Sequence, residues 1–282
     1  MERADLHFHS LHSDGKHSVD FLCDWLAKQI QDGLQLAVLT DHDGVDGFEI
    51  FDRLSEAPWP SIRACELSCG VSLRGAESTE LHLLIYGLNE TDAYLREAFQ
   101  RFREERRTRF DEICRRLRAD GYELAAEEVA TEHKGVLGRP HVADALIRTG
   151  VVKSRKEAFD RFLSNSSKYL PKKWRIPIEE ALTHCRKKGY RTAIAHPGIY
   201  GLKREHLVVL KDWGLDAVEV IHPKHKPSDE KFYRALADSL GLFVSGGSDF
   251  HDGETDLING LPSLGRAPYS YSEARDFLAP FL

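Results

Sequence analysis

The sequence predicts an α/β protein whose main part is a β/α barrel interrupted by an inserted helical domain. Short aliphatic or β-branched runs alternate with segments whose apolar residues recur every three or four positions, which is typical of parallel βαβ units. About seven such runs are candidate strands, and they lie at residues 4–9, 36–40, 61–67, 81–88, 192–196, 217–221 and 242–246.

The segments between these strands favour helices that cover a sheet. A helical apolar pattern with a glycine near its end occurs at residues 19–33, 177–189, 204–214 and 229–241. His82 stands at the beginning of its strand, whereas the other candidate ligands stand at strand ends. This position suggests that the fourth strand pairs antiparallel with the preceding one.

A long stretch, residues 90–174, offers helices and no convincing strand. It begins with a charged helix at 92–120 and continues through GRPHVADALIRTG and KEAFDRFL. We therefore expect residues 1–89 and 175–282 to form the barrel and residues 90–174 to form the inserted helical domain. One side of the first helix is marked by apolar Leu95, Phe99, Phe102, Phe110, Ile113 and Leu117.

Composition limits the class of protein. The chain has 282 residues, of which 41% are hydrophobic and 30% charged, so it can bury a full core without disulfides. Its five cysteines are odd in number and scattered, which predicts reduced thiols. No run approaches the roughly 18 apolar residues of a membrane span, and no secretory segment opens the chain. A cytoplasmic protein is expected, and its net charge of −6 argues against binding of long duplex nucleic acid.

Nearly every candidate strand ends in a residue that can bind a metal. Active sites of β/α barrels gather at the C-terminal ends of the strands, so these residues are expected to meet in space. Mixed imidazole and carboxylate ligands suit divalent zinc, manganese or iron. The candidates are His7, His9, Asp14, Asp41, His42, Asp43, Glu66, His82, His196, Glu219, His222, Asp249 and His251.

Other polar residues have plainer interpretations. A single histidine is more often a surface or core residue than a ligand, and the repetition of ligands at successive strand ends is what favours a metal site. Cys65 and Cys69 are interpreted as packing residues, and Asp41 as a partner that orients an imidazole. His222 and His225 are placed at the pocket rim. A surface position is expected for His12, His17, His133, His184 and His206.

These motifs together resemble a known family. The segments DLHFHSLHSDG, TDHDGVDG, the region of Glu66 and His82, AHP and GSDFH are similar, in this order, to the motifs of the PHP phosphoesterases, named for polymerase and histidinol phosphatase. The segments GRPHVADAL and KYLPKKW resemble the branch that acts as 3′,5′-nucleoside-bisphosphate phosphatase and as 5′-to-3′ exoribonuclease on short RNA.

The resemblance implies a distorted seven-stranded barrel with a trinuclear metal site. Glu66 or Asp249 is expected to bridge ions, and manganese is the expected metal, with zinc or iron as alternatives. Gly44, the segment after Glu66 and the loop near Lys168 depart from the usual family pattern, so the substrate pocket is expected to differ. The implied ligands are His7, His9, Asp14, His42, Glu66, His82, His196, Asp249 and His251.

The implied reaction is hydrolysis of a phosphate ester by a metal-bound hydroxide, with two or three cations stabilising the phosphate charge. Arg139 and His141 are candidates for binding the phosphate, His141 also as a possible acid, and Lys168 is a further candidate. The alternative for Arg139 is that it and Pro140 only begin a helix.

The predicted substrate is a small phosphorylated molecule, either a 3′,5′-nucleoside bisphosphate or the 5′ end of a short RNA. A histidinol-phosphate-type phosphomonoesterase is the second hypothesis, because the same metal site could serve it. The third hypothesis is a non-catalytic scaffold stabilised by metal. No membrane partner is expected.

Overall fold

The computed structural model describes residues 2–54, 57–73, 80–132, 137–164 and 166–282. Its internal contacts divide the chain into two compact units. The first unit comprises Met1–Ser10, Gly15–Asp92 and Arg175–Leu282, and the second comprises Leu11–Asp14 and Ala93–Trp174. The fold is mixed α/β, with the sheets in the first unit.

The larger sheet of the first unit has six strands in the order β5-β3-β4-β6-β7-β8. Strands β6, β7 and β8 run parallel, whereas β4 is antiparallel to both of its neighbours, β3 and β6. The strands are β3 (Ala64–Gly70), β4 (Glu80–Tyr86), β5 (Ile176–Pro177), β6 (Arg191–Ile194), β7 (Ala217–Ile221) and β8 (Phe243–Gly246).

The antiparallel pairing of the fourth predicted strand is confirmed. In the ladder between β3 and β4, Ser68 lies opposite His82 and Glu66 lies opposite Leu84. Side chains two residues apart on a strand share a face, so His82 stands diagonally across from Glu66 on the same side of the sheet. The reversed strand thus brings its first residues, instead of its last, to the end of the sheet where Glu66 lies.

A second sheet has the order β11-β1-β2, formed by β1 (Arg3–Asp5), β2 (Leu34–Ala37) and β11 (Tyr269–Ser270). Beyond these short strands the chain stays in contact with the larger sheet. Phe8, which follows β1, makes a parallel bridge to Phe250, and His42, which follows β2, makes one to Glu66. Single bridges therefore link the two sheets on both sides.

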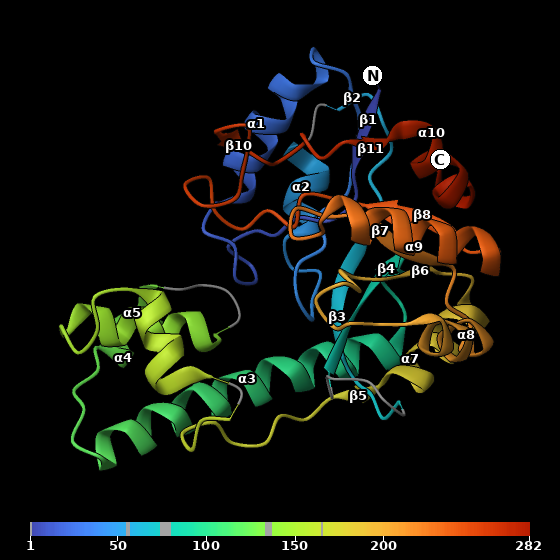
Figure 1. The fold of residues 1–282 in the computed structure, drawn as a ribbon. Helices are drawn as coiled ribbons and strands as arrows, with labels where there is room; N and C mark the ends of the chain where they lie inside the picture. Colours follow the sequence, from blue (N-terminus) through green and yellow to red (C-terminus); the bar gives the residue numbers. More distant parts are fainter. Residues whose placement is uncertain (1, 55–56, 74–79, 133–136, 165) are drawn as a thin grey trace. The chain divides into compact units, whose positions relative to one another are not determined.

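Helices flank these sheets in the first unit (Figure 1). All four predicted helices are present, and α7 and α9 end at Gly189 and Gly241, whose φ angles of 76° and 61° are left-handed. Helix α9 packs on β7 and β8, and α10 on β8. The helices are α1 (Val19–Ile30), α2 (Phe48–Leu54), α7 (Ile178–Lys188), α8 (Arg204–Trp213), α9 (Pro227–Leu240) and α10 (Tyr271–Leu278).

The second unit contains helices, turns and irregular segments, and no strand among its described residues. Its first helix, α3 (Ala93–Ala119), buries every apolar residue that the sequence pattern assigned to one side. Residues of α3, such as Phe110 and Leu117, share a core with Leu146 of α5 and Leu163. The remaining helices are α4 (Ala126–Glu132), α5 (Arg139–Arg148), α6 (Arg155–Ala158) and the π-helical turn η1 (Phe159–Leu163).

Several short elements were not predicted. They are α2, α10, the 3₁₀ turn η2 (Ala279–Phe281), β5, β11 and the hairpin of β9 (Leu257–Ile258) with β10 (Leu261–Pro262). Each predicted strand overlaps an observed one, while the closed seven-stranded barrel stays a prediction. None of the helices in the described parts of the chain is long and apolar enough to cross a membrane.

Candidate metal centre

The centre begins with two histidines that follow β1. His7 and His9 flank Phe8, which belongs to the apolar core of the first unit, and all three side chains are fully buried. Alternation along the extended chain therefore sends Phe8 to the core and both imidazoles to the other side. The backbone of Gly247 approaches this segment so closely that a Cβ there would lie 2.5 Å from His7 Cβ.

One oxygen of Glu66 is the point on which three imidazoles converge. Glu66 Oε2 lies 3.2 Å from His7 Nε2, 3.1 Å from His9 Nε2 and 3.2 Å from His42 Nδ1. A parallel backbone bridge between His42 and Glu66 places the His42 ring here. The carboxylate comes from the middle of β3 and is almost completely buried.

The other oxygen of Glu66 faces histidines that come from β4 and from the segment after β6. Glu66 Oε1 lies 2.8 Å from His82 Nδ1 and 3.0 Å from His196 Nε2. His82 is the third residue of the reversed strand β4, and its Nε2 lies 3.3 Å from Glu80 Oε1. His196 follows β6. Glu66 therefore touches imidazoles supplied by several different strands.

Asp249, which follows β8, is the second carboxylate of the centre. Its Oδ1 lies 3.4 Å from Nε2 of His7 and 3.4 Å from Nε2 of His9. His251 Nδ1 lies 2.8 Å from the carbonyl oxygen of Asp249, so this nitrogen donates to the backbone and leaves Nε2 of the ring as an acceptor. The opposite oxygen, Oδ2, lies 3.1 Å from His222 Nε2.

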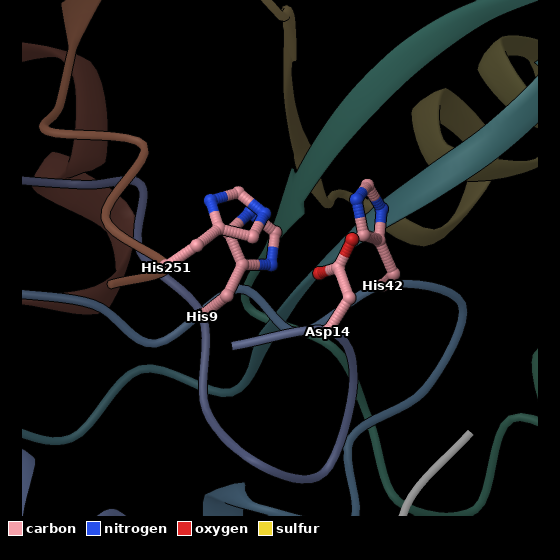
Figure 2. Close-up of side chains that lie close together, drawn as sticks. All are labelled: His9, Asp14, His42 and His251. Atoms are coloured by element: carbon pink, nitrogen blue, oxygen red, sulfur yellow. The ribbon is translucent and has the colours of Figure 1, made fainter. Parts of the chain in front are cut away.

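Three groups of side chains could each hold a metal ion, because within each group the ligand atoms lie within 4.8 Å of one another. One of them, formed by His9, Asp14, His42 and His251, is drawn in Figure 2. The other two groups are His7, His9, Glu66 and Asp249, and His42, Glu66 and His82. His196 joins them through its contact with Glu66, so the nine predicted ligands gather in one region.

The donor atoms suit a divalent cation. Glu66 Oε2 is buried and has no hydrogen-bond partner among the described residues. His7 Nδ1 lies 2.8 Å from Glu219 Oε1 and so carries the proton of the neutral ring, which leaves a lone pair on Nε2. That Nε2 faces His9 Nε2 at 3.2 Å. Lone pairs and a carboxylate oxygen that point toward one another favour a positive ion between them.

The electrostatics of the centre also favour a cation. Burial acts to lower the pKa of His7, but the carboxylates of Glu219, Glu66 and Asp249 outweigh it and raise that pKa well above its usual value. Burial acts to raise the pKa of Glu66, and the neighbouring imidazoles nevertheless hold it well below its usual range. The Glu66 carboxylate is therefore charged, and its buried negative charge attracts positive charge, either protons on the imidazoles or metal ions.

Glu219 holds two of the ligands in place. Besides its contact with His7, its Oε2 accepts the backbone N–H of His196 at 2.5 Å. The sequence indicated a metal-type residue at this strand end, and the structure shows a fully buried carboxylate behind the imidazoles. Asp256, which no motif indicated, has a similar role, because its Oδ2 accepts the backbone N–H of His251 at 2.7 Å.

Backbone strain is concentrated in these segments. His196 and Asp249 have left-handed φ angles of 32° and 46°, and Asp43 has one of 52°. Residues other than glycine adopt the left-handed region of φ and ψ at an energetic cost, and strained residues of this kind cluster at functional sites. Asp43 is held by bonds from the Ser68 backbone N–H at 2.6 Å and from its hydroxyl at 3.0 Å.

Asp41 was predicted to orient an imidazole, and in the structure its carboxylate bonds the neighbouring loop. Its carboxylate accepts the backbone N–H of Ser10 at 2.7 Å and the Ser10 hydroxyl at 2.8 Å. Ser10 directly follows His9, so Asp41 fixes the chain beside a predicted ligand. Cys65 and Cys69 are buried on β3, which agrees with their interpretation as packing residues.

The predicted phosphate-binding residues lie in the second unit. Arg139 and His141 begin α5, where His141 Nδ1 accepts the backbone N–H of Gly138 at 2.8 Å and caps the helix. Arg139 donates to the carbonyl oxygen of Leu163 at 3.1 Å. Lys168 is exposed and forms an ion pair with Asp120, at 2.5 Å. Their predicted role in binding phosphate stays a prediction.

The structure corrects the placement of three other histidines. His206 was expected at the surface, but it is only 2% exposed because its Nδ1 accepts the Lys203 N–H at the start of α8. His222 and His225 were placed at the pocket rim, and both are buried. His222 contacts Asp249, while His225 bonds the backbone of the surrounding loops. His12, His17 and His184 are partly exposed, and His133 lies outside the described residues.

The fold and the buried cluster of histidines and carboxylates define the class of a metal-dependent hydrolase. No protein-family model matches the chain. The 3′,5′-nucleoside bisphosphate phosphatase of Chromobacterium violaceum is 28% identical over 288 residues, covering 98% of this chain and 98% of that protein. The 5′-3′ exoribonuclease Rnm of Escherichia coli K12 is 28% identical over 256 residues, covering 88% of this chain and 84% of the relative.

A solved structure agrees with these relatives. A protein from Bifidobacterium adolescentis, classed as a metal-dependent phosphoesterase, superposes with a TM-score of 0.84 at 26% identity, covering 100% of this chain and 97% of its own. The resemblance that the motifs indicated is thus confirmed. The chain is a hydrolase of the metal-dependent phosphoesterase class, and its cluster of histidines and carboxylates is able to bind metal.

Proposed function

We propose that this protein hydrolyses a phosphate ester of a small nucleotide, either a 3′,5′-nucleoside bisphosphate or the 5′ end of a short RNA. The single observation that carries the proposal is the gathering of all nine predicted ligands in one largely buried cluster. A non-catalytic scaffold would not require all nine metal-donor side chains. Relatives along nearly the whole chain, a bisphosphate phosphatase and an exoribonuclease, support the choice of substrate.

We propose that the cluster holds two or three divalent ions, with manganese as the expected metal and zinc or iron as alternatives. The donor set supports this, because imidazole nitrogens and carboxylate oxygens without thiolates suit these metals. Three overlapping groups of ligand atoms share Glu66, His9 or His42, as a trinuclear centre with bridging carboxylates would require. Bound ions supply Lewis-acid chemistry, lowering the pKa of water and neutralising phosphate charge.

The chain's own residues prepare this chemistry by fixing donor atoms. Glu219 holds the proton of His7 on Nδ1, and the carbonyl oxygen of Asp249 holds that of His251 on Nδ1. In both rings Nε2 is left to bind a cation. Because these contacts are made within the folded protein, little reorganisation accompanies substrate binding, and preorganised charge is the main contribution that a protein makes to phosphoryl transfer.

We further propose that residues 90–174 act as an inserted helical domain whose Arg139, His141 and Lys168 bind the phosphate, with His141 as a possible acid. A guanidinium matches phosphate oxygens in a bidentate manner, and an imidazole can donate a proton. Arg139 and His141 both lie in the first turn of α5, and the start of a helix favours bound anions. A phosphate at Lys168 would have to displace its partner Asp120.

For the fold, we propose that the seven principal strands close into a distorted barrel. The bridge between Phe8 and Phe250 connects the segments that follow β1 and β8, and the bridge between His42 and Glu66 connects β2 with β3. With the ladders of the two sheets, these contacts relate each of the seven strands to two neighbours. Such an arrangement would bring the strand ends, and the ligands on them, together.

The test of the proposed function is release of phosphate or nucleotide by the manganese-loaded protein. Adenosine 3′,5′-bisphosphate, a 5′-phosphorylated short RNA and histidinol phosphate are compared, with Asp249→Asn as the control. Turnover of either nucleotide substrate, lost in Asp249→Asn, is the expected result. Turnover of histidinol phosphate alone would replace the substrate, and no turnover of any of the three would favour the scaffold hypothesis.

A further inference from the structure

A lysine that no motif indicated lies on a predicted metal ligand. Lys224, in the loop between β7 and α9, places its Nζ 3.2 Å from Asp249 Oδ2. The lysine side chain is 65% exposed, whereas Asp249 is only 8% exposed. The ammonium group therefore reaches from solvent to the buried carboxylate, at a position that an incoming anion could also reach.

The two oxygens of Asp249 have different neighbours. Oδ1 faces Nε2 of His7 and of His9, each at 3.4 Å. On the other side, His222 Nδ1 accepts the backbone N–H of Lys224 at 3.1 Å, so the neutral His222 ring carries its proton on Nε2. That Nε2 lies 3.1 Å from Oδ2 and donates to it. Protein N–H groups thus occupy Oδ2, and Oδ1 is the oxygen that faces the ligand cluster.

Metal ions at the site would change which negative charge balances the Lys224 ammonium group. Its ammonium is balanced by Asp249 as long as that carboxylate is not shared with a cation. Divalent ions bound by the cluster would take up the negative charge of Asp249 and would place further positive charge near Nζ. The ammonium group of Lys224 is then available to an anionic partner, and a phosphate group bound at the same ions is one.

We propose that Lys224 is a substrate-binding residue whose ammonium group contacts a phosphate oxygen of the ligand at the metal centre. This inference rests on the proposed function in that it takes a phosphate ester as the substrate. The proposed contact involves the phosphate group alone and does not depend on the alcohol to which the phosphate is joined. The other possible role of Lys224 is structural, in which it only steadies Asp249.

The experiment measures binding of inorganic phosphate to the manganese-loaded protein by titration calorimetry, with metal content determined for every variant. Lys224→Met removes the charge and keeps most of the side chain. Lys224→Arg keeps the charge. Lys226→Met removes an exposed lysine of the same segment and is the matched control. We expect Lys224→Met to weaken phosphate binding by about tenfold or more, the usual contribution of one charge-assisted hydrogen bond.

Lys224→Arg is expected to retain most of the affinity and Lys226→Met all of it, with equal metal content in each protein. In turnover assays Lys224→Met should raise KM more than it lowers kcat. Phosphate binding by Lys224→Met equal to wild type, or a loss explained by missing metal and restored at saturating manganese, would overturn the inference. Failure of the proposed substrates with normal, Lys224-dependent phosphate binding would instead overturn the substrate and leave the inference standing.

Discussion

Glu66 places its two carboxylate oxygens against different sets of histidines. Oε2 faces His7, His9 and His42, and Oε1 faces His82. A carboxylate is costly to bury unless positive charge surrounds it, and the imidazoles alone supply that charge only when they are protonated. Divalent ions meet the same need without protons, which is why we regard Glu66 as the centre of the site.

The first prediction concerns this residue. Glu66→Gln keeps the shape of the side chain and removes its charge, so we expect bound manganese to fall by at least one ion per chain. Activity should fall by more than about 100-fold, since even partners behind the ligands typically contribute 10–100-fold. Metal analysis and turnover of the folded variant check this. Glu90→Gln, a charge removal at a 72% exposed position, is the control, and full metal content in Glu66→Gln would contradict the prediction.

The second prediction concerns the residue behind the ligands. Glu219 fixes the tautomer of His7 and bonds the backbone of His196, so Glu219→Gln should weaken metal affinity by roughly 10–100-fold while the protein stays folded. Competition with a chelator of known affinity measures this. Glu205→Gln, at an exposed position of α8, serves as the control. An affinity equal to wild type would mean that Glu219 only fills space.

At this scale the sequence predicted which side chains gather better than it predicted which atoms they contact. Residues at spacing two, such as His7 with His9 and Asp249 with His251, share a face of the chain, and this is visible without a structure. The roles of Glu219 and Lys224 depend on which atoms meet across strands, and no spacing encodes that. His206 was misplaced because its ring caps a helix, a use that its surface-like sequence surroundings did not reveal.

Among the elements, the reversed strand β4 is the one that departs from a regular β/α alternation. Its beginning lies beside the end of β3, as the ladder between Ser68 and His82 shows. The position of His82 in the sequence was enough to predict this pairing. Two-residue strands such as β5 and β9 could not be predicted, because so few residues carry no periodic pattern.

The third prediction concerns the end of α9. Gly241 has a φ of 61°, and the nearest atom to an added Cβ would be Lys211 Nζ at 3.9 Å, so substitution adds backbone strain and no clash. Gly241→Ala should lower the free energy of unfolding by about 1–2 kcal/mol. Gly241→Asn should lower it less, because asparagine tolerates the left-handed region. Urea unfolding of the three proteins measures this, and equal stability of the alanine variant and wild type would refute the assignment of strain.

For the molecule as a whole, the buried cluster couples metal binding to stability. Ligands drawn from segments after β1, β2, β6 and β8 must come together for an ion to bind, so the ion binds the folded chain only. The hydrophobic cores hold these segments in place, but they do not remove the mutual repulsion of buried carboxylates. Removal of metal should therefore loosen the first unit.

The fourth prediction follows from this coupling. Manganese at a concentration of about 100 times Kd should stabilise the protein by about 2.7 kcal/mol. For a chain of this size the corresponding rise in Tm is roughly 5 °C relative to chelator-treated protein. Differential scanning calorimetry with and without chelator measures it, and Glu66→Gln should show a smaller rise. An unchanged Tm on chelation would separate metal binding from folding and contradict the prediction.

The most direct test of the central claim is anomalous diffraction from crystals of the manganese-loaded protein. We expect anomalous peaks within coordination distance of donor atoms of His7, His9, Glu66 and Asp249, with Glu66 contacting more than one ion. In Asp249→Asn at least one of these peaks should be lost. Peaks elsewhere on the chain, or none within the cluster at saturating manganese, would contradict the claim that these residues form a metal centre.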